Sequence, residues 1–310
     1  MNEFELIARL TRSLPSNKSV VTGAGDDCAM LDLGLPDRLL LFKTDAVVEG
    51  IHFQPGASPE KVGHKALARC LSDIAAMAGT PTAAVLTLAL PARFDPGWIE
   101  AVYDGLNQLA RRHEVAIVGG ETVTNPQGLL ISVAVMGWVP RGKAVLRSGA
   151  EAGDAIFVTG ELGGSLTGKH LEFEPRLVEA RWLAQEFSIH SMIDLSDGLA
   201  GDLRHVLKAS RAGAELLKNS IPVSRAAKQD SRAGTSSKSP LLAAMTDGED
   251  FELLFTVASR DAVPLLDAWK KQFPKLALTC IGKITASEGI TLRGKAGMQL
   301  FPDHGYEHFA

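Results

Sequence analysis

Acidic residues stand in this sequence where strands are expected to end and where glycine turns follow. Adjacent carboxylates repel one another, and burying them unpaired costs free energy. A divalent cation removes that cost, and magnesium prefers carboxylate, water and phosphate oxygens as ligands. The acids therefore indicate metal ions held against the phosphates of a nucleotide. They are Asp26, Asp27, Asp45, Asp73, Glu121, Asp194, Asp197, Glu249 and Asp250.

Each of these acids also has a simpler explanation. A lone aspartate is most often a turn former or a helix cap. Asp73 lies within an apolar helical pattern, where Arg69, four residues earlier, or Lys65 could pair with it in a salt bridge. The set is harder to explain in this way, because Asp45 and Asp194 both follow short apolar segments, where ligand sites of α/β proteins form. Both interpretations of Asp73 stay open.

Two glycine-rich segments, residues 119–120 and 159–168, could bind phosphates through backbone N–H groups. Neither matches a Walker A loop or the dinucleotide-binding GxGxxG pattern, and most glycine turns are turns alone. His52 is a candidate substrate contact and Arg147 a candidate phosphate contact. A lone histidine is more often structural, and an isolated arginine is usually a surface charge.

Composition limits the classes of function. The chain has 310 residues, of which 45% are hydrophobic and 22% charged, as in ordinary globular proteins. A net charge of −4 argues against nucleic-acid binding. The acidic N-terminus does not resemble a signal peptide, and no run of about 18 apolar residues predicts a membrane span. The three scattered cysteines do not form a disulfide framework, so we expect a cytoplasmic protein.

Helical and strand patterns alternate in both halves of the chain. The glycine-rich segment 141–154 predicts a boundary between domains 1–148 and 149–310. The polar stretch 226–240 predicts a surface loop or a disordered insert. We expect helices at 3–13, 60–78, 96–112, 198–208 and near 261–272, and strands at 39–44, 83–90, 115–118, 129–139, 155–159 and near 277–284 and 289–293. Residues 215–221 are expected to form a strand or an extended segment.

Eight motifs, taken in order, resemble those of the thiamine-monophosphate kinases, a family in the superfamily of aminoimidazole ribonucleotide synthetase. They are GAGDDCAML at 23–31, KTDAVVEGIHF at 43–53, KALARCLSDIAAMAG at 65–79, VGGET at 118–122, LRSGAEAGDAIFVTG at 146–160, IDLSDGL at 193–199, DGEDFELLFTV at 247–257 and GYEHF at 305–309. The resemblance implies an α/β (α+β) fold of two domains, aminoimidazole ribonucleotide synthetase-like, with mixed sheets and flanking helices. It also implies a homodimer formed through an N-terminal domain that binds ATP and metal.

The resemblance also implies a role for individual residues. Positions matching metal ligands are Asp27, Thr44, Asp45, Asp73, Glu121, Asp194 and Asp197. Positions matching nucleotide contacts are Gly120, Glu121, Arg147 and Ser196, and those facing thiamine monophosphate are His52, Glu249 and Tyr306. The implied reaction is in-line transfer of the γ-phosphate of ATP, aided by several Mg²⁺ ions and needing no dedicated catalytic base, since the phosphate nucleophile is already ionised. The sequence does not show whether a K⁺ ion binds in addition to the Mg²⁺ ions.

Three departures from the family pattern concern the expected site. The family usually has serine at the position of Lys43, whose ammonium could occupy a metal subsite or turn outward. The family's GGD is Gly-Gly-Glu here, ending at Glu121, and the segment after Gly168 is shortened to residues 169–176. Two alternatives to the kinase therefore remain: a superfamily relative with another ATP-using reaction, and a non-catalytic nucleotide-binding paralogue. The absence of a reactive N-terminal or C-terminal cysteine argues against the first of these.

Overall fold

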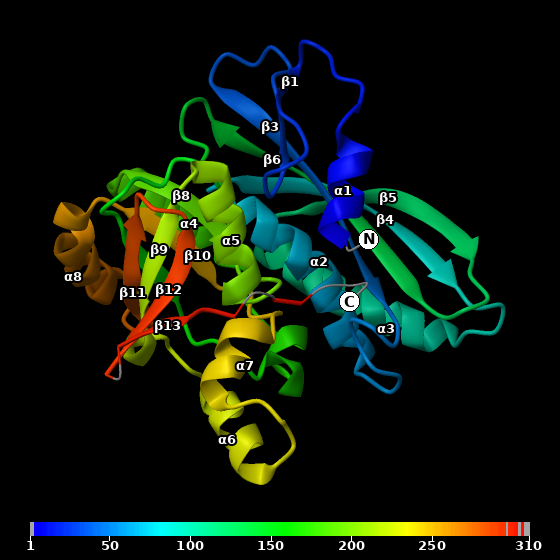
Figure 1. Cartoon of the computed structure of the whole chain (residues 1–310). Helices are drawn as coiled ribbons and strands as arrows, with labels where there is room; N and C mark the ends of the chain where they lie inside the picture. The colour runs from blue at the N-terminus through cyan, green and yellow to red at the C-terminus, as the bar shows by residue number, and fades with distance from the viewer. Residues whose placement is uncertain (1–2, 296, 303–304, 307–310) are drawn as a thin grey trace. The chain divides into compact units, whose positions relative to one another are not determined.

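The computed structural model describes residues 3–295, 297–302 and 305–306 of the chain (Figure 1). These residues divide into two units, each built on one mixed sheet, as expected. The six-stranded unit comprises Lys18–Ala144 together with His170–Leu177. The seven-stranded unit comprises Met1–Asn17, Val145–Lys169 and Val178–Ala310.

The sheet of the six-stranded unit has the strand order β1-β2-β3-β6-β4-β5. Its strands are β1 (Val20–Thr22), β2 (Ala29–Leu31), β3 (Arg38–Val48), β4 (Thr80–Leu90), β5 (Ala116–Thr124) and β6 (Leu130–Pro140). Neighbouring strands run antiparallel except for β4 and β5, which run parallel. Because side chains alternate along a strand, Leu41 and Val47 point into the core while Phe42 stays exposed on the other face.

Two helices cover one face of this sheet, α2 (Pro59–Ala76) and α3 (Pro96–Arg112) (Figure 1). The Asp95 carboxylate begins α3 by accepting the N–H of Gly97, and proline follows at the first helical position. The other face of the sheet carries no helix within this unit, and we call it the open face. It exposes the apolar side chains of Phe42, Val85 and Met136.

Glycines let α2 and α3 approach each other closely. A Cβ atom on Gly105 would lie 1.8 Å from the carbonyl oxygen of Glu60, and one on Gly63 would lie 1.8 Å from that of Val102. Both distances are far below van der Waals contact, and in both cases the obstacle is backbone of the other helix. The position of α2, which carries Asp73, therefore depends on glycine at these two sites.

Gly105→Ala is expected to lower the free energy of unfolding by about 2–3 kcal/mol, because a methyl group there forces the helices apart. Gly97→Ala is the matched control on the same helix. Its added Cβ would meet only the Asp95 carboxylate, at 3.4 Å, so alanine should be neutral or stabilise the helix by up to about 1 kcal/mol. Urea titration of both variants measures the difference, and equal stabilities would contradict the close-packing argument.

The sheet of the seven-stranded unit has the order β13-β12-β9-β11-β7-β10-β8. Its strands are β7 (Ala155–Thr159), β8 (Ile189–Asp194), β9 (Gly213–Leu217), β10 (Leu253–Val257), β11 (Leu278–Thr285), β12 (Gly289–Gly294) and β13 (Gly297–Leu300). The helices of the unit are α1 (Glu3–Thr11), α4 (Leu177–Glu186), α5 (Leu199–Ser210), α6 (Arg225–Ala233), α7 (Pro240–Thr246) and α8 (Ala262–Gln272). Only β9 and β12 pair in parallel among the described strands of this sheet.

Apolar side chains pack on both faces of this sheet. On one face the aliphatic side chains of β7, β8 and β10 pack with Leu199 and Leu203 of α5 and with Met245 of α7. The opposite face carries Phe157 and Phe255, whose rings stack with centroids 5.5 Å apart. Aromatic rings also join α4 to α8, which contact each other through Trp182 and Trp269. This core holds the carboxyl end of β8, where Asp194 lies, in a fixed position.

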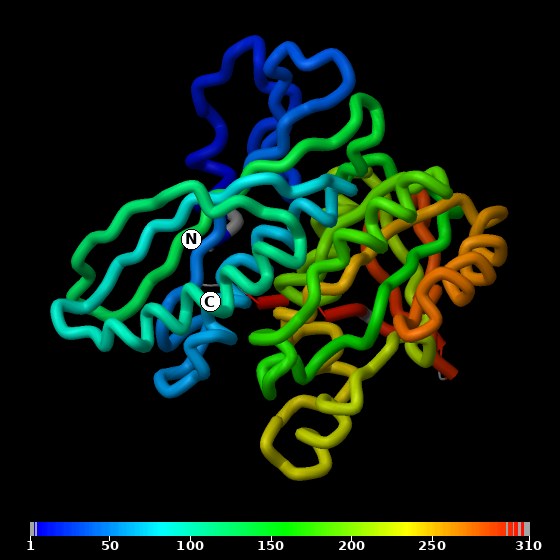
Figure 2. The backbone as a smooth tube through the Cα atoms, turned by 180° about the vertical axis from the view of Figure 1, so that it is seen from behind, coloured from blue at the N-terminus to red at the C-terminus, as the bar shows by residue number. Residues whose placement is uncertain are grey.

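Most expected elements are confirmed, but two predictions were wrong. The stretch 226–240 is not a loop, because it contains α6 and the start of α7, which Figure 2 shows together in yellow. The Ser224 side chain caps α6 by accepting the N–H of Ala227, and Gly234 ends it with φ of 69°. The strand expected at 115–118 continues through both glycines to Thr124.

Candidate functional site

Three carboxylates and two cationic side chains gather where β3, α2 and the turn after β1 meet in the six-stranded unit. We call Asp27, Lys43, Asp45, Arg69 and Asp73 the acidic cluster. Asp27 and Asp73 are only 1% and 7% exposed, and their carboxylate oxygens lie within 4.8 Å of each other. Lys43 and Asp45 are two residues apart on β3, so their side chains point to the same face of the sheet, toward α2.

Two ion pairs of the acidic cluster join β3 to α2, and neither was expected from the sequence. The Lys43 ammonium lies 2.9 Å from Asp73, and the Arg69 guanidinium lies 3.0 Å from Asp45. The structure therefore gives Asp73 and Arg69 each a partner on β3 that the sequence did not suggest. Burial alone would lower the pKa of Lys43, but Asp73, Asp45 and Asp27 outweigh it and raise the pKa above its usual value. Lys43 thus enters the cluster as a cation.

Two buried thiols adjoin the acidic cluster. Burial is the main cause that raises the pKa of Cys28 well above its usual value, and the charges of Asp73 and Asp27 add to it. Burial, with Asp45 and Asp73, raises the pKa of Cys70 in the same way. Both thiols remain protonated at neutral pH, so neither is a thiolate nucleophile or ligand.

The residues assigned to metal and nucleotide by resemblance lie on both faces of the six-stranded sheet. Asp45 of β3 and Gly120 of β5 are aligned across the sheet, with β6 and β4 between them, and both face the helices α2 and α3. Thr44 and Glu121 point to the open face instead. The Thr44 hydroxyl donates to the carbonyl of Val133 at 3.1 Å, and Glu121 is exposed. Glu121 stands three strands from β3, roughly 14 Å across the sheet, so it is not part of the acidic cluster.

Glycines 119–120 lie within strand β5 and do not form a loop. A Cβ on Gly120 would lie 2.0 Å from the carbonyl oxygen of Leu86, at the bulge where β4 and β5 change register.

His52 follows β3, and its Nδ1 accepts the N–H of Val48 at 3.1 Å. The neutral His52 ring therefore carries its proton on Nε2. The backbone carbonyl oxygen of His52 accepts a hydrogen bond from the Lys65 ammonium at 2.6 Å, which holds the turn after β3 in place.

A second group of expected site residues comes together in the seven-stranded unit. Asp194 is the last residue of β8 and is buried, and Ser196 and Asp197 follow in the turn before α5. The N–H of Glu249 donates to the Ser196 carbonyl at 2.7 Å, and the N–H of Tyr306 donates to the Asp197 carbonyl at 2.9 Å. Residues far apart in sequence are thus joined by their backbones. Glu249 holds φ at 55°, which costs free energy for a residue other than glycine.

Asp202 belongs to this group and was not found from the sequence. It is buried in the first turn of α5 and accepts the N–H of Asp197 at 3.0 Å. Burial, followed by the charges of Asp197 and Asp194, raises the pKa of Asp202, and Arg147 opposes this shift. The charge of Arg147 therefore acts on the Asp202 carboxylate. The signal in the sequence was an acid five residues after Asp197, on the core side of an amphipathic helix.

The glycine-rich segment 159–168 already binds carboxylates of this chain. The N–H of Gly163 donates to both oxygens of Asp250, at 2.9 and 3.0 Å, and that of Gly164 donates to Asp247 at 3.2 Å. Glu252 accepts from the Thr159 hydroxyl and from Lys169, both at 2.8 Å. The interpretation of this segment as a phosphate cradle is therefore not supported at these amides. Their role is to hold the segment that carries Glu249.

The shortened segment after Gly168 is firmly attached to α2 and α3. Phe173 is buried, and its carbonyl oxygen lies 2.7 Å from Nε2 of His64. Glu174 pairs with His113 at 2.8 Å and also with Arg112. Burial, with the charge of Lys65, lowers the pKa of the nearby His170 to about 4, so this imidazole is neutral at pH 7.

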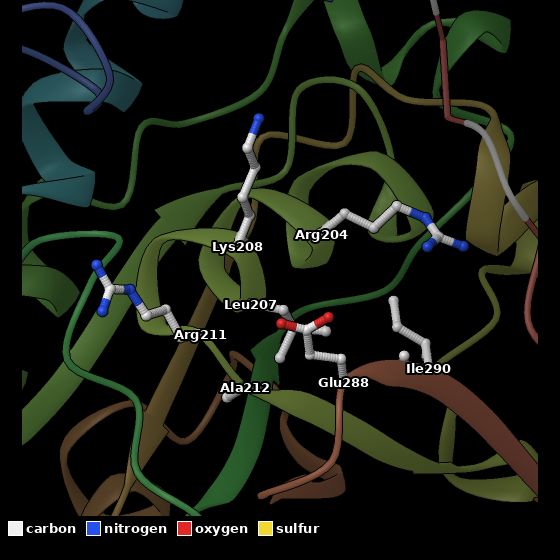
Figure 3. A pocket seen from close by; sticks show the side chains of 8 residues that line it. Arg204, Leu207, Lys208, Arg211, Ala212, Glu288 and Ile290 are labelled. Atoms are coloured by element: carbon white, nitrogen blue, oxygen red, sulfur yellow. The ribbon is translucent and has the colours of Figure 1, made fainter.

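A cavity of about 330 Å³ lies beside α5, lined by residues between 204 and 212 and by residues 288–290 (Figure 3). Its basic side chains, Arg204, Lys208 and Arg211, point in different directions, and the Glu288 carboxylate lies among them. An anion would need the cations to converge. We therefore do not assign this cavity to a nucleotide.

Comparison with known proteins identifies the family. The chain is 42% identical to thiamine-monophosphate kinase of Rhodopirellula baltica, with 96% of this chain and 93% of that protein covered. It is 32% identical to thiamine-monophosphate kinase of Bacillus subtilis, with both chains covered completely. The chain belongs to the thiamine-monophosphate kinase family. The family AIR synthase related protein, N-terminal domain, matches residues 25–139, which confirms the expected fold class.

Solved structures agree with this family. The structure described as AaThiL complexed with AMPPCP and TMP has a TM-score of 0.81 and 29% identity, covering 99% of this chain and 97% of that one. The hydrogenase maturation protein HypE of Escherichia coli has a TM-score of 0.73 at 22% identity, with 98% of both chains covered. The second likeness shows the fold alone. No helix in the described part of the chain combines the length and apolar character of a membrane span.

Proposed function

We propose that this protein transfers the γ-phosphate of ATP to the phosphate of thiamine monophosphate, forming thiamine diphosphate and ADP. The observation that carries the proposal is family membership over the full chain, with 42% identity to a named kinase over 96% of this chain. The related structure bound to AMPPCP and TMP supports the same substrate pair. The arrangement of buried acids agrees, because transfer between two polyanions chiefly requires charge neutralisation and positioning.

The donor set fits magnesium. Asp27 and Asp73 place hard carboxylate oxygens within 4.8 Å of each other, and Asp45 adds another on the same side of β3. In the seven-stranded unit we propose Asp194 and Asp197 as further ligands, with Thr44 and Glu121 acting on the open face of the six-stranded sheet. When bound, the ions would neutralise charge on the phosphates of both substrates. Potassium remains a proposal that rests on resemblance alone.

The residues of the chain would bind and orient the substrates. We propose that Arg147, Ser196, Gly120 and Glu121 contact ATP, and that His52, Glu249 and Tyr306 contact thiamine monophosphate. His52 would donate from Nε2, because its Nδ1 accepts the N–H of Val48. No residue is required as a base, since a phosphate nucleophile is already ionised at neutral pH.

We propose a homodimer in which a second copy covers the open face. Phe42, Val85 and Met136 expose apolar surface there, and β5 is an exposed edge strand of the same sheet. We also propose a cytoplasmic location, supported by three free cysteine thiols.

The test is to incubate the purified protein with ATP, MgCl₂ and thiamine monophosphate and to follow thiamine diphosphate by chromatography. We expect one ADP for each thiamine diphosphate, and no product from unphosphorylated thiamine. Binding of ATP without product would overturn the kinase and favour a non-catalytic paralogue.

Asp45→Asn is expected to reduce turnover about 10–100-fold while the protein stays folded, because the amide keeps the shape but loses a charge near the metal. Asp32→Asn is a matched control, since Asp32 also pairs with an arginine, Arg141 at 2.6 Å, but on the surface. Steady-state kinetics and circular dichroism of both variants measure the effect. Full activity of Asp45→Asn would remove this carboxylate from the site.

A further inference from the structure

The acidic cluster already contains a cation at the position where its carboxylates converge. The Lys43 ammonium lies 2.9 Å from Asp73, and its side chain is only 26% exposed. Asp45 stands two residues along the same strand, and the Asp27 carboxylate lies within 4.8 Å of that of Asp73. An ammonium among three carboxylates occupies the space and satisfies the charge that a metal ion would otherwise take.

Charge balance shows what this lysine changes. Three carboxylates with Lys43 and Arg69 leave the acidic cluster a formal charge of −1. Without the lysine the charge would be −2, which matches one divalent ion. An ammonium donates three hydrogen bonds at about 2.9 Å, whereas magnesium needs oxygen ligands at about 2.0–2.1 Å. Lysine and magnesium therefore cannot occupy the same place together.

We propose that Lys43 is a built-in cation that replaces one divalent metal ion in the acidic cluster. The inference rests on the proposed phosphotransferase function for its purpose. The lysine is attached to β3, so its charge stays in place whatever the metal concentration. The cluster is then partly neutralised before any metal binds, and the protein binds one divalent ion fewer than its carboxylates could support. In the reaction, the ammonium would donate hydrogen bonds to phosphate in place of that ion.

The test counts metal ions and does not depend on turnover. Binding of Mn²⁺ to the protein without nucleotide is followed by electron paramagnetic resonance of the free ion. We expect Lys43→Ser to bind one more Mn²⁺ per chain than the unsubstituted protein, and Lys43→Arg to bind the same number as the unsubstituted protein. Lys61→Ser is the matched control, because Lys61 pairs with Glu172 on the surface at 2.9 Å.

Thermal unfolding gives a second readout. EDTA should leave the melting temperature of the unsubstituted protein nearly unchanged, whereas Lys43→Ser should melt lower in EDTA and recover with Mg²⁺. If Lys43→Ser fails to fold even with Mg²⁺, Lys43→Ala takes its place in both measurements. Equal Mn²⁺ counts and equal EDTA responses in the unsubstituted protein and the neutral variant would overturn the proposal. A failed kinase assay with a changed Mn²⁺ count would instead overturn only the proposed activity.

Discussion

Asp73→Asn is expected to lower thiamine diphosphate formation by at least about 1000-fold, equivalent to about 4 kcal/mol of transition-state stabilisation. Asp73 is 7% exposed, lies near Asp27 and faces the Lys43 ammonium at 2.9 Å. The substitution removes a proposed metal ligand and leaves that ammonium without its carboxylate partner. The stability loss should be only about 1–2 kcal/mol, because Lys43 is partly exposed and can turn toward water.

A double substitution separates activity from stability. Lys43→Met together with Asp73→Asn removes both charges, so the free energy of unfolding should return to within about 1 kcal/mol of its original value. Turnover should stay low, because the carboxylate is still absent. Asp104→Asn, on the exposed side of α3, is the control and should change neither quantity. Recovery of turnover in the double variant would mean that Asp73 serves only to neutralise Lys43.

Local signals in the sequence placed many elements correctly. The helix expected at 96–112 is confirmed from Pro96 to Arg112, and the structure shows that Asp95 caps its start. The stretch 226–240 was misread because α6 is polar and buries only Ala227, so it lacks the apolar stripe that marks a helix. Its capping residues, Ser224 and Gly234, were the available signal. The predicted strand at 115–118 was too short, because we expected the glycine pair 119–120 to end it, whereas β5 continues to Thr124.

Side-chain partners could not be predicted in the same way. The sequence suggested Arg69 for Asp73 because they are four residues apart on one helix. The structure gives each of them a partner on β3, Lys43 for Asp73 and Asp45 for Arg69. Such contacts depend on how a helix packs on a sheet, which no local pattern records. Resemblance named Glu249 and Tyr306, but only the fold shows that their backbones bond to residues 196–197.

Asp250 makes stability depend on pH in a direction opposite to most paired carboxylates. It is 1% exposed and accepts both from the N–H of Gly163 and from the Ser165 hydroxyl. Burial raises its pKa from 3.8 to about 7, although Lys169, Ser165 and Gly163 act against the shift. Between these values the folded protein keeps a proton that the unfolded chain releases. The contribution of Asp250 to stability is therefore full below pH 4 and is lost as the pH rises to about 7.

Asp250→Asn is expected to abolish this pH dependence, because the amide stays neutral while its oxygen still accepts from Gly163. Roughly three pH units correspond to about 4 kcal/mol, so the unfolding free energy of Asp250→Asn relative to the original protein should rise by that order between pH 4 and 8. Urea titrations across this range measure the difference. Asp267→Asn, on the exposed side of α8, should give a constant difference. A constant difference for Asp250→Asn as well would show that its carboxyl ionises normally, and that the bonds holding the Glu249 segment are made by a charged group at every pH.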